Sequence, residues 1–231
     1  MDFRNFLLSA LTAADLQALL PALSEVSLVS GQVLFEVGAT AEAVYFPSSA
    51  VVSLVTVMED GRSVESHTIG RESGVGLLNV ASRRPVESRV FTQVAGTALR
   101  LPADALRRRV AESPAFTELL LRHVHAASLQ TQQFVACNVL HAAEQRLARW
   151  LLMTADRTGS SSFLLTQEYM AVMTGVQRTT VSAIATGFRE AGLIRYSRGK
   201  VEILNHDGLQ KVSCECARVV HGQFKALQQS G

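Results

Sequence analysis

The chain has 231 residues, of which 48% are hydrophobic and 18% are charged. This is enough for one large or two small domains with hydrophobic cores, and no apolar run approaches the roughly 18 residues of a membrane span. A net charge of only +2 excludes a polycation, so any nucleic-acid binding must come from a local cluster of cations.

The N-terminus and the cysteines bear on the compartment. The first residues lack the basic segment and apolar run of a secretory signal, because Asp2 and Asn5 interrupt them. The three cysteines are odd in number and widely placed, which argues against a disulfide framework and for a reducing environment. We therefore expect a cytoplasmic protein that does not enter a membrane.

The sequence pattern of the N-terminal half changes near residue 29. Residues 1–28 predict a small helical lead-in, since Thr12 and Asp15 resemble a capping box. Residues 29–102 carry short apolar runs at regular spacing, separated by Gly, Pro and Ser, which predicts an antiparallel β-roll able to enclose one ligand. The expected strands lie near residues 33–35, 44–47, 51–55, 67–69, 90–94 and 98–101.

A long helix is predicted to follow the roll. Five of its residues recur at alternating steps of four and three, as in a coiled coil, and so predict a homodimer; the alternative is one helix packed on its own roll. These positions are Leu120, Val124, Ala127, Thr131 and Phe134. The expected division is a sensor roll at 1–112, a dimerisation helix at 113–140 and a DNA-binding domain at 141–231.

Charge is distributed unevenly between the two parts of the chain. Residues 141–231 contain 11 Lys and Arg against 7 Asp and Glu, whereas residues 1–140 contain 11 against 13. This asymmetry indicates a basic C-terminal module beside a neutral-to-acidic domain.

Residues 166–204 have the pattern of a winged helix-turn-helix. Thr166 is suited to cap a first short helix, Gly175 to provide the positive φ of the turn, and Gly192 to end a second helix. Two short alternating runs at 193–204 then predict a β-hairpin, the wing. The alternative is an ordinary helical hairpin buried in a core.

The predicted second helix begins with polar residues and has no acidic residue before Glu190. In a recognition helix the first turns enter the major groove of double-stranded DNA, where Arg178 could contact a guanine edge and Gln177 a base or phosphate. Hairpin cations would lie along the backbone and add affinity without sequence information. The expected DNA contacts are Thr166, Gln167, Gln177, Arg178, Thr179, Thr180, Ser182, Arg195, Arg198 and Lys200.

The order of these parts resembles the CRP/FNR superfamily of bacterial transcription regulators over nearly the whole chain. The segments that carry the resemblance are VYFP at 44–47, EQRLARWLL at 144–152, LTQE at 165–168, RTTVS at 178–182 and GLI at 192–194.

The resemblance implies an α+β fold with a jelly-roll-like β-roll, a long dimerisation helix and a winged helix-turn-helix. It also implies a homodimer on a palindromic operator, a possible small-molecule effector, and RNA polymerase as a further partner. Residues 177–183 would read bases, with Arg178 where family members commonly carry a base-contacting arginine. Thr179 and Ala183 stand where the cyclic-AMP receptor has Glu and Arg, so a different operator is expected.

The sensor end departs from the members that bind cyclic nucleotides, which use a Gly-Glu pair and a following Arg-Ser pair. Here Gly76 replaces the ribose-binding Glu, and Glu87 occupies the phosphate-binding Arg position, where it would repel an anion. Arg89 lies one residue past Ser88 and would compensate only if the register shifted. Cyclic AMP is therefore not expected.

Metal cofactors are not expected either. The iron–sulfur members need an N-terminal cysteine cluster, and no cysteine precedes Cys137. His67, His123 and His125 leave haem open, although single histidines are more often structural.

Cys214 and Cys216 form a CxC pair that could bind zinc with His206 or His221. Zinc clusters usually use C-x₂₋₄-C spacing, so buried structural cysteines are the preferred interpretation and no metal is expected.

Two other classes of function were compared with DNA binding. A cupin-type metalloenzyme needs clustered His and Glu, but residues 29–102 contain one histidine, and no catalytic triad or phosphate-binding loop is apparent; the chain is not expected to be an enzyme. A sensor that docks on a protein partner without specific DNA binding is the alternative. A steep salt dependence of DNA affinity would distinguish DNA binding from docking.

Overall fold

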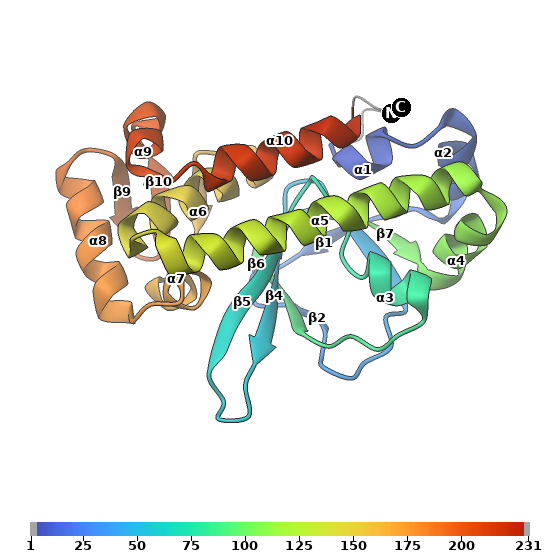
Figure 1. The fold of residues 1–231 in the computed structure, drawn as a ribbon, viewed down its shortest axis with the longest axis horizontal. Helices are drawn as coiled ribbons and strands as arrows, with labels where there is room; N and C mark the ends of the chain where they lie inside the picture. Colours follow the sequence, from blue (N-terminus) through green and yellow to red (C-terminus); the bar gives the residue numbers. More distant parts are fainter. Residues whose placement is uncertain (1–3, 229–231) are drawn as a thin grey trace.

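One long helix joins two lobes of the molecule. The computed structural model describes residues 4–228, and for residues 226–228 it describes the backbone alone. Figure 1 shows helix α5 (Pro114–Leu140) running along the molecule from a β-roll to a small helical lobe. The predicted α+β fold is confirmed. Among the described residues, no helix has the length and apolar character needed to cross a membrane.

The roll consists of two antiparallel sheets, with strand orders β1-β7-β3 and β2-β6-β4-β5. The six predicted strands are present. A seventh, β1, was missed because it lies in the segment predicted as a helical lead-in; it forms by pairing with β7, more than 60 residues later. The strands are β1 (Ser24–Leu28), β2 (Val33–Phe35), β3 (Ala43–Pro47), β4 (Val51–Val57), β5 (Ser63–Ile69), β6 (Arg89–Val94) and β7 (Gly96–Pro102).

Short helices close the roll. In the predicted capping box, the backbone N–H of Asp15 donates to Thr12 Oγ1 at 3.1 Å. Inward-facing side chains of β3, such as Val44 and Phe46, pack with Leu106 in a core that excludes water. These helices are α1 (Phe6–Ser9), α2 (Ala13–Leu19), the 3₁₀ turn η1 (Leu20–Ala22), α3 (Leu77–Ser82) and α4 (Ala103–Glu112).

The second lobe is a winged helix-turn-helix. Val181 and Phe188 of the second helix are 0% and 1% exposed, so the apolar face predicted there is the one that packs in the core. The wing has three strands in the order β8-β10-β9, one more than predicted. The elements are α6 (Ala143–Thr158), β8 (Ser162–Leu164), α7 (Gln167–Thr174), α8 (Arg178–Glu190), β9 (Ile194–Ser197), β10 (Lys200–Ile203) and α9 (His206–Val212).

One hydrophobic cluster, separate from the core of the roll, contains residues of both lobes. Val51 and Val55 of the roll belong to the same buried cluster as Met170 and Met173 of α7. The rings of Phe91 in β6 and Tyr169 in α7 stack with their centroids 5.7 Å apart. The position of the DNA-binding lobe is therefore held by buried apolar contact and not by the covalent link alone.

A last helix, α10 (Cys216–Gln228), runs back beside α5 (Figure 1). Its Val220 and Phe224 pack on Ala126 of α5, together with the partly buried Phe134. The guanidinium of Arg149 lies 4.1 Å from the centroid of the Phe134 ring.

The predicted dimer seam is thus partly covered by its own chain. Leu120 packs in the core of the roll and Phe134 under Arg149 and α10; Val124 and Ala127 are half-buried, and only Thr131 is exposed. Heptad spacing reports an apolar face but does not identify what covers it. A second series at the same spacing, one residue further along, is exposed throughout: Leu121, His125, Ser128, Gln132, Val135 and Val139.

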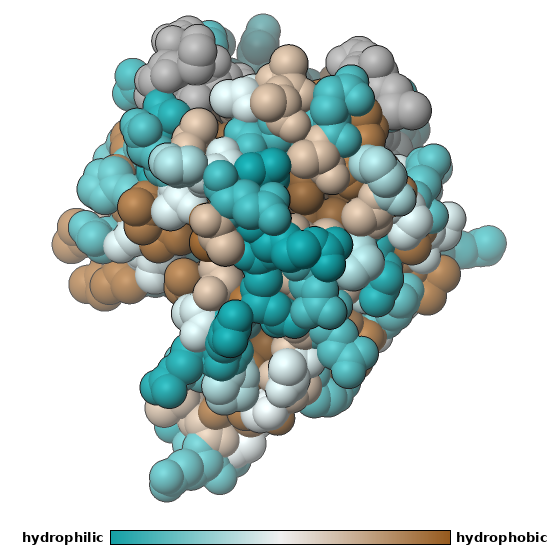
Figure 2. Space-filling view, turned by 90° about the vertical axis from the view of Figure 1, so that its right-hand side faces the viewer, coloured by the Kyte–Doolittle hydropathy of each residue, from teal (hydrophilic) through white to brown (hydrophobic). Residues whose placement is uncertain are grey.

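The end of the molecule opposite the helix-turn-helix lobe has both hydrophilic and hydrophobic side chains on its surface. Figure 2 shows hydrophilic side chains in a band across the middle of this face, with hydrophobic side chains between them in small groups. Arg108 of α4 is among the exposed cations of the roll. Such a mixture is typical of a surface in contact with water.

We predict that acid destabilises the fold through His123. This side chain is 4% exposed, its Nε2 lies 2.7 Å from Ser73 Oγ, and burial lowers its pKa to about 4. As pH falls below about 6.5, the unfolded chain takes up a proton that the native chain does not, so stability is lost down to about pH 4, by about 3 kcal/mol.

The comparison is urea unfolding of wild type and His123→Gln at about pH 7 and about pH 5. Glutamine retains a partner for Ser73 but does not titrate, so the variant should lose less stability on acidification. His67, whose pKa burial also lowers to about 4, and Glu65, whose pKa burial raises, are common to both proteins. An equal pH dependence would contradict the assignment.

Candidate nucleic-acid interface

Local sequence creates the helix-turn-helix as predicted. Thr166 caps α7, since its Oγ1 accepts the backbone N–H of Tyr169 at 3.2 Å. Gly175 ends α7 with φ of 65°, and Gly192 follows α8 with φ of 68°. Both values lie in the left-handed region that glycine adopts without steric cost. The chain therefore turns sharply between α7 and α8 and again before the wing.

The N-terminal end of α8 is open to solvent. Gln177, Arg178, Thr179 and Thr180 are all exposed, and the Gln177 side chain does not cap the helix. The first turn contains no acidic residue. The exposed N–H groups and the helix dipole make this end electropositive, a suitable environment for phosphate.

Gln167 and Ser182 occupy a more enclosed position than the other predicted contacts. Ser182 Oγ lies 2.8 Å from Gln167 Oε1 and 3.0 Å from the backbone oxygen of Arg178. Both side chains are half-buried. In this structure they brace the start of α7 against α8.

The wing presents its cations at a tight turn. Arg198 and Gly199 have φ values of 50° and 75°, which is typical of the two-residue hairpin turns that match strand twist. Lys200 and Arg198 are exposed, whereas Arg195 forms an ion pair with Glu202 at 2.5 Å. The charge available at the wing therefore comes mainly from two of the three predicted cations.

Tyr196 in β9 is a residue of this surface that sequence reasoning did not select. It is half-buried, and burial raises the pKa of its phenol, while the backbone of Gln167 and the nearby charge of Arg178 act in the opposite direction. Its place in an alternating strand gave no signal beyond wing packing. The structure thus brings the wing, the start of α7 and Arg178 to one face.

Three positions of the roll correspond to the nucleotide-binding positions discussed above: Gly76, Glu87 and Arg89. Gly76 has φ of 82°, and a Cβ atom there would lie 3.1 Å from the Phe35 ring. Glu87 is exposed, and Arg89 is paired with Glu36 at 3.5 Å.

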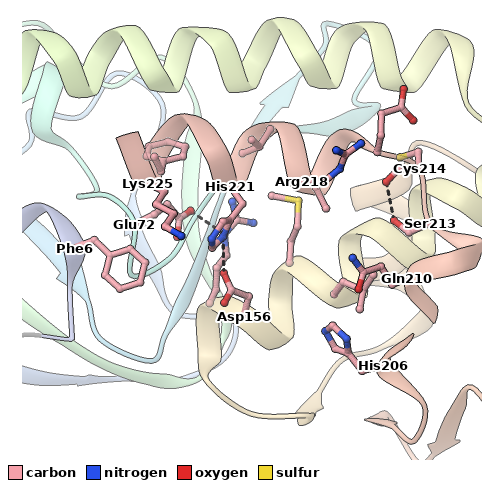
Figure 3. Close-up of a pocket in the computed structure, with 17 residues that line it drawn as sticks. Phe6, Glu72, Asp156, His206, Gln210, Ser213, Cys214, Arg218, His221 and Lys225 are labelled. Carbon is pink, nitrogen blue, oxygen red and sulfur yellow. Dashed lines mark hydrogen bonds and ion pairs between the residues drawn. The ribbon is translucent and has the colours of Figure 1, made fainter. Parts of the chain in front are cut away.

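A pocket of about 900 Å³ lies outside the roll, between α6, α9 and α10 (Figure 3). Arg157 of α6 lies beside it and is bound by Glu72 at 2.8 Å. Asp156 bonds to Arg71 at 2.7 Å and lies 3.7 Å from His221. The pocket walls thus contain the ion pairs that connect α6 to the roll.

The three cysteines meet beside α5. The ligand atoms of Cys137, His141, Cys214 and Cys216 lie within 4.8 Å of one another. The cysteines are buried, as expected, but the histidine beside Cys214 and Cys216 is His141 and not the alternative partner His206 or His221, both of which lie outside the cluster. The signal available in the sequence was the spacing of Cys137 and His141, four residues apart where the long helix ends.

Known proteins match both lobes. A family model for the Crp-like helix-turn-helix domain matches residues 145–212, and one for the cyclic nucleotide-binding domain matches residues 25–113. A CRP-like cAMP-activated global transcriptional regulator of Mycobacterium tuberculosis is 27% identical over 201 residues, covering 84% of this chain and 90% of the relative. A global nitrogen regulator of Synechococcus elongatus is 24% identical over 185 residues, covering 76% and 83%.

Solved structures agree on the fold. A CRP-family transcriptional regulator from Thermus thermophilus superposes with a TM-score of 0.67 at 19% identity, over 81% of this chain and 96% of that one. A Crp/Fnr-family regulator from Eubacterium rectale gives 0.68 at 16% identity, over 99% and 100%. The chain is a transcription regulator with a DNA-binding helix-turn-helix and an effector-binding domain. It belongs to the CRP/FNR family.

We predict that the lobe contact depends on the buried pair of Glu72 and Arg157, whose side chains are 11% and 5% exposed. Glu72→Ala would leave the Arg157 cation uncompensated and should cost about 3–5 kcal/mol of unfolding free energy. Asp60→Ala removes an exposed pair with Arg62 and should cost less than about 1 kcal/mol. Similar losses in urea unfolding of the two variants would contradict this prediction.

Proposed function

We propose that a homodimer of this chain binds a palindromic operator, with the start of α8 from each subunit in successive major grooves. The observation that carries the proposal is the exposed, acid-free first turn of α8, which begins at Arg178. Two such helices must lie about 34 Å apart to engage both half-sites. Arg198 and Lys200 would contact the backbone beside each groove.

The proposed dimer uses the exposed face of α5. Leu121, Val135 and Val139 are 65%, 62% and 78% exposed, which is unusual for apolar side chains at heptad spacing. Pairing this face with a second copy would bury them. The partly covered seam at 120–134 supports dimerisation less well.

The proposed effector is not cyclic AMP, although the mycobacterial relative is described as cAMP-activated. A glutamate at position 76 would press on the Phe35 ring and need a strained left-handed backbone, so this position is poorly suited to the missing ribose ligand. Exposed Glu87 would repel the phosphate, and Arg89 already has Glu36 as its partner.

The proposed switch is a shift in population between two spacings of the recognition helices. Gln130 Nε2 of α5 donates to the backbone oxygen of Thr68 in the roll at 3.3 Å. A movement of strand β5 would therefore alter a contact with the helix. A regulator of this kind would meet RNA polymerase at a promoter as its further partner.

Selection of bound sequences from a random DNA pool tests the function. Wild type should enrich a palindrome. Arg178→Ala should lose discrimination at one base position in each half-site, at a cost of about 1–3 kcal/mol per half-site, while Lys200→Ala should weaken binding to all sequences and reduce the salt slope by about 1 per subunit.

The matched control is Arg108→Ala on α4, which removes the same charge from the roll. It should bind like wild type. If Arg178→Ala keeps the wild-type preference at every position, the base-reading assignment is wrong. A wild type whose DNA affinity does not fall with salt would favour the protein-docking alternative.

Dimerisation has a separate test by sedimentation equilibrium. Leu121→Asp and Val135→Asp each place a charge in the proposed seam, so both should shift the protein toward monomer. Leu78→Asp changes an equally exposed leucine on α3, 58% exposed, and should remain dimeric. Loss of the dimer in Leu78→Asp alone would contradict the proposed seam.

A further inference from the structure

We propose that Cys137, His141, Cys214 and Cys216 bind one zinc ion in a closed structural site. All three cysteines of the chain are in this cluster, and each is buried. They come from two distant segments, the end of α5 and the start of α10. Three thiolates and an imidazole are a ligand set that prefers zinc, in the Cys₃His arrangement of structural sites.

Two distances within the cluster are close to those of a zinc tetrahedron. In a tetrahedron, zinc–sulfur bonds of about 2.3 Å and zinc–nitrogen bonds of about 2.0 Å place sulfurs about 3.8 Å apart and sulfur about 3.5 Å from nitrogen. The Sγ atoms of Cys137 and Cys214 are 3.6 Å apart, and Sγ of Cys216 is 3.6 Å from His141 Nδ1. The ligand atoms all lie within 4.8 Å of one another, so binding of the metal would shorten the longest separation by up to about 1 Å.

The histidine is oriented as a metal ligand by its other nitrogen. Nε2 of His141 lies 3.3 Å from a carboxylate oxygen of Glu215, while Nδ1 faces the sulfurs. A proton on Nε2 that is donated to Glu215 leaves the lone pair of Nδ1 directed at the centre of the cluster. A carboxylate that fixes the tautomer in this way usually accompanies metal-bound histidine.

Further polar groups suit a negatively charged centre. Gln133 Nε2 donates to Cys216 Sγ at 3.2 Å. Arg149 is 3% exposed, forms no ion pair within 4.0 Å among the described residues, and lies close enough to interact electrostatically with Cys137 and Cys214. Zinc with three thiolates carries one net negative charge, which would compensate this buried cation.

The ion would fasten two elements that the covalent chain leaves far apart. Cys137 and His141 lie at the C-terminal end of α5, just before the DNA-binding lobe begins, and the CxC pair lies just after α9. Zinc would therefore attach both ends of the DNA-binding lobe, the start of α6 and the end of α9, to the end of α5. Binding would release the thiol protons to solvent, and the metal's oxidation state would not change.

Metal analysis of the full chain, purified without chelators, tests the site. We expect about one zinc ion per chain in wild type and in the control His206→Ala/His221→Ala, whose histidines lie outside the cluster. Cys216→Ser and Cys137→Ser should each lose nearly all of it. Because these variants can lose zinc by failing to fold, a second measurement uses wild type alone.

In that measurement, metal-stripped, reduced wild type is titrated with Co²⁺. Tetrahedral cobalt with thiolate charge-transfer absorption, displaced by one equivalent of Zn²⁺, would support the site. Gln133→Ala, which retains all four ligands, should bind cobalt about 10–100-fold more weakly.

Three results would overturn the proposal. One is folded wild type that contains no zinc and gives no thiolate absorption with cobalt. Another is loss of zinc in the His206→Ala/His221→Ala control while Cys216→Ser retains it. The third is a Cys137–Cys214 disulfide, detected by mass spectrometry in freshly purified protein. None of these readouts depends on DNA binding, so the two proposals fail independently.

Discussion

Burial of apolar side chains between the roll and α7 is the interaction on which the arrangement of the molecule depends. Val51, Val55 and Phe91 on the roll and Met170 and Met173 on α7 form one water-excluding cluster. This cluster fixes the position of the helix-turn-helix relative to the roll, together with the packing of α10 on α5. The buried pair of Arg157 and Glu72 adds direction to this contact, because the stem of Arg157 packs closely on Gly70, where any Cβ atom would collide.

The two faces of the helix-turn-helix differ in polarity and exposure. The inner face is apolar and buried, while the start of α8 and the tip of the wing are polar, cationic and open. A surface that binds phosphate must remain exposed to water until DNA binds, so burial in the core cannot fix its geometry. Its geometry comes from the local caps at Thr166, Gly175 and Gly192.

Helix α5 has three faces in different environments. One stripe packs in the roll, another receives α10, and a third is left exposed with apolar residues at heptad spacing. Its last turn carries Cys137 and is followed by His141, close to the start of α10. The helix therefore connects the sensor, the proposed dimer contact and the proposed zinc site.

The sequence alone determined the elements whose signals are local. The turn glycines, the cap at Thr166, the face of Val181 and Phe188, and six roll strands all follow from residues within one or two turns of each other. The exposed start of α8 was predicted in the same way. These patterns reflect backbone preferences and periodic burial, which do not need a distant partner.

Only the tertiary structure decided what depends on distant pairing. Strand β1 exists because β7 pairs with it, and the exposed heptad face of α5 lies one residue from the expected seam because the roll and α10 cover Leu120 and Phe134. The cysteine cluster joins residues 77 positions apart, Cys137 and Cys214. Spacing along a chain specifies a face or a motif, but which surface meets that face is set by the packing of the whole fold.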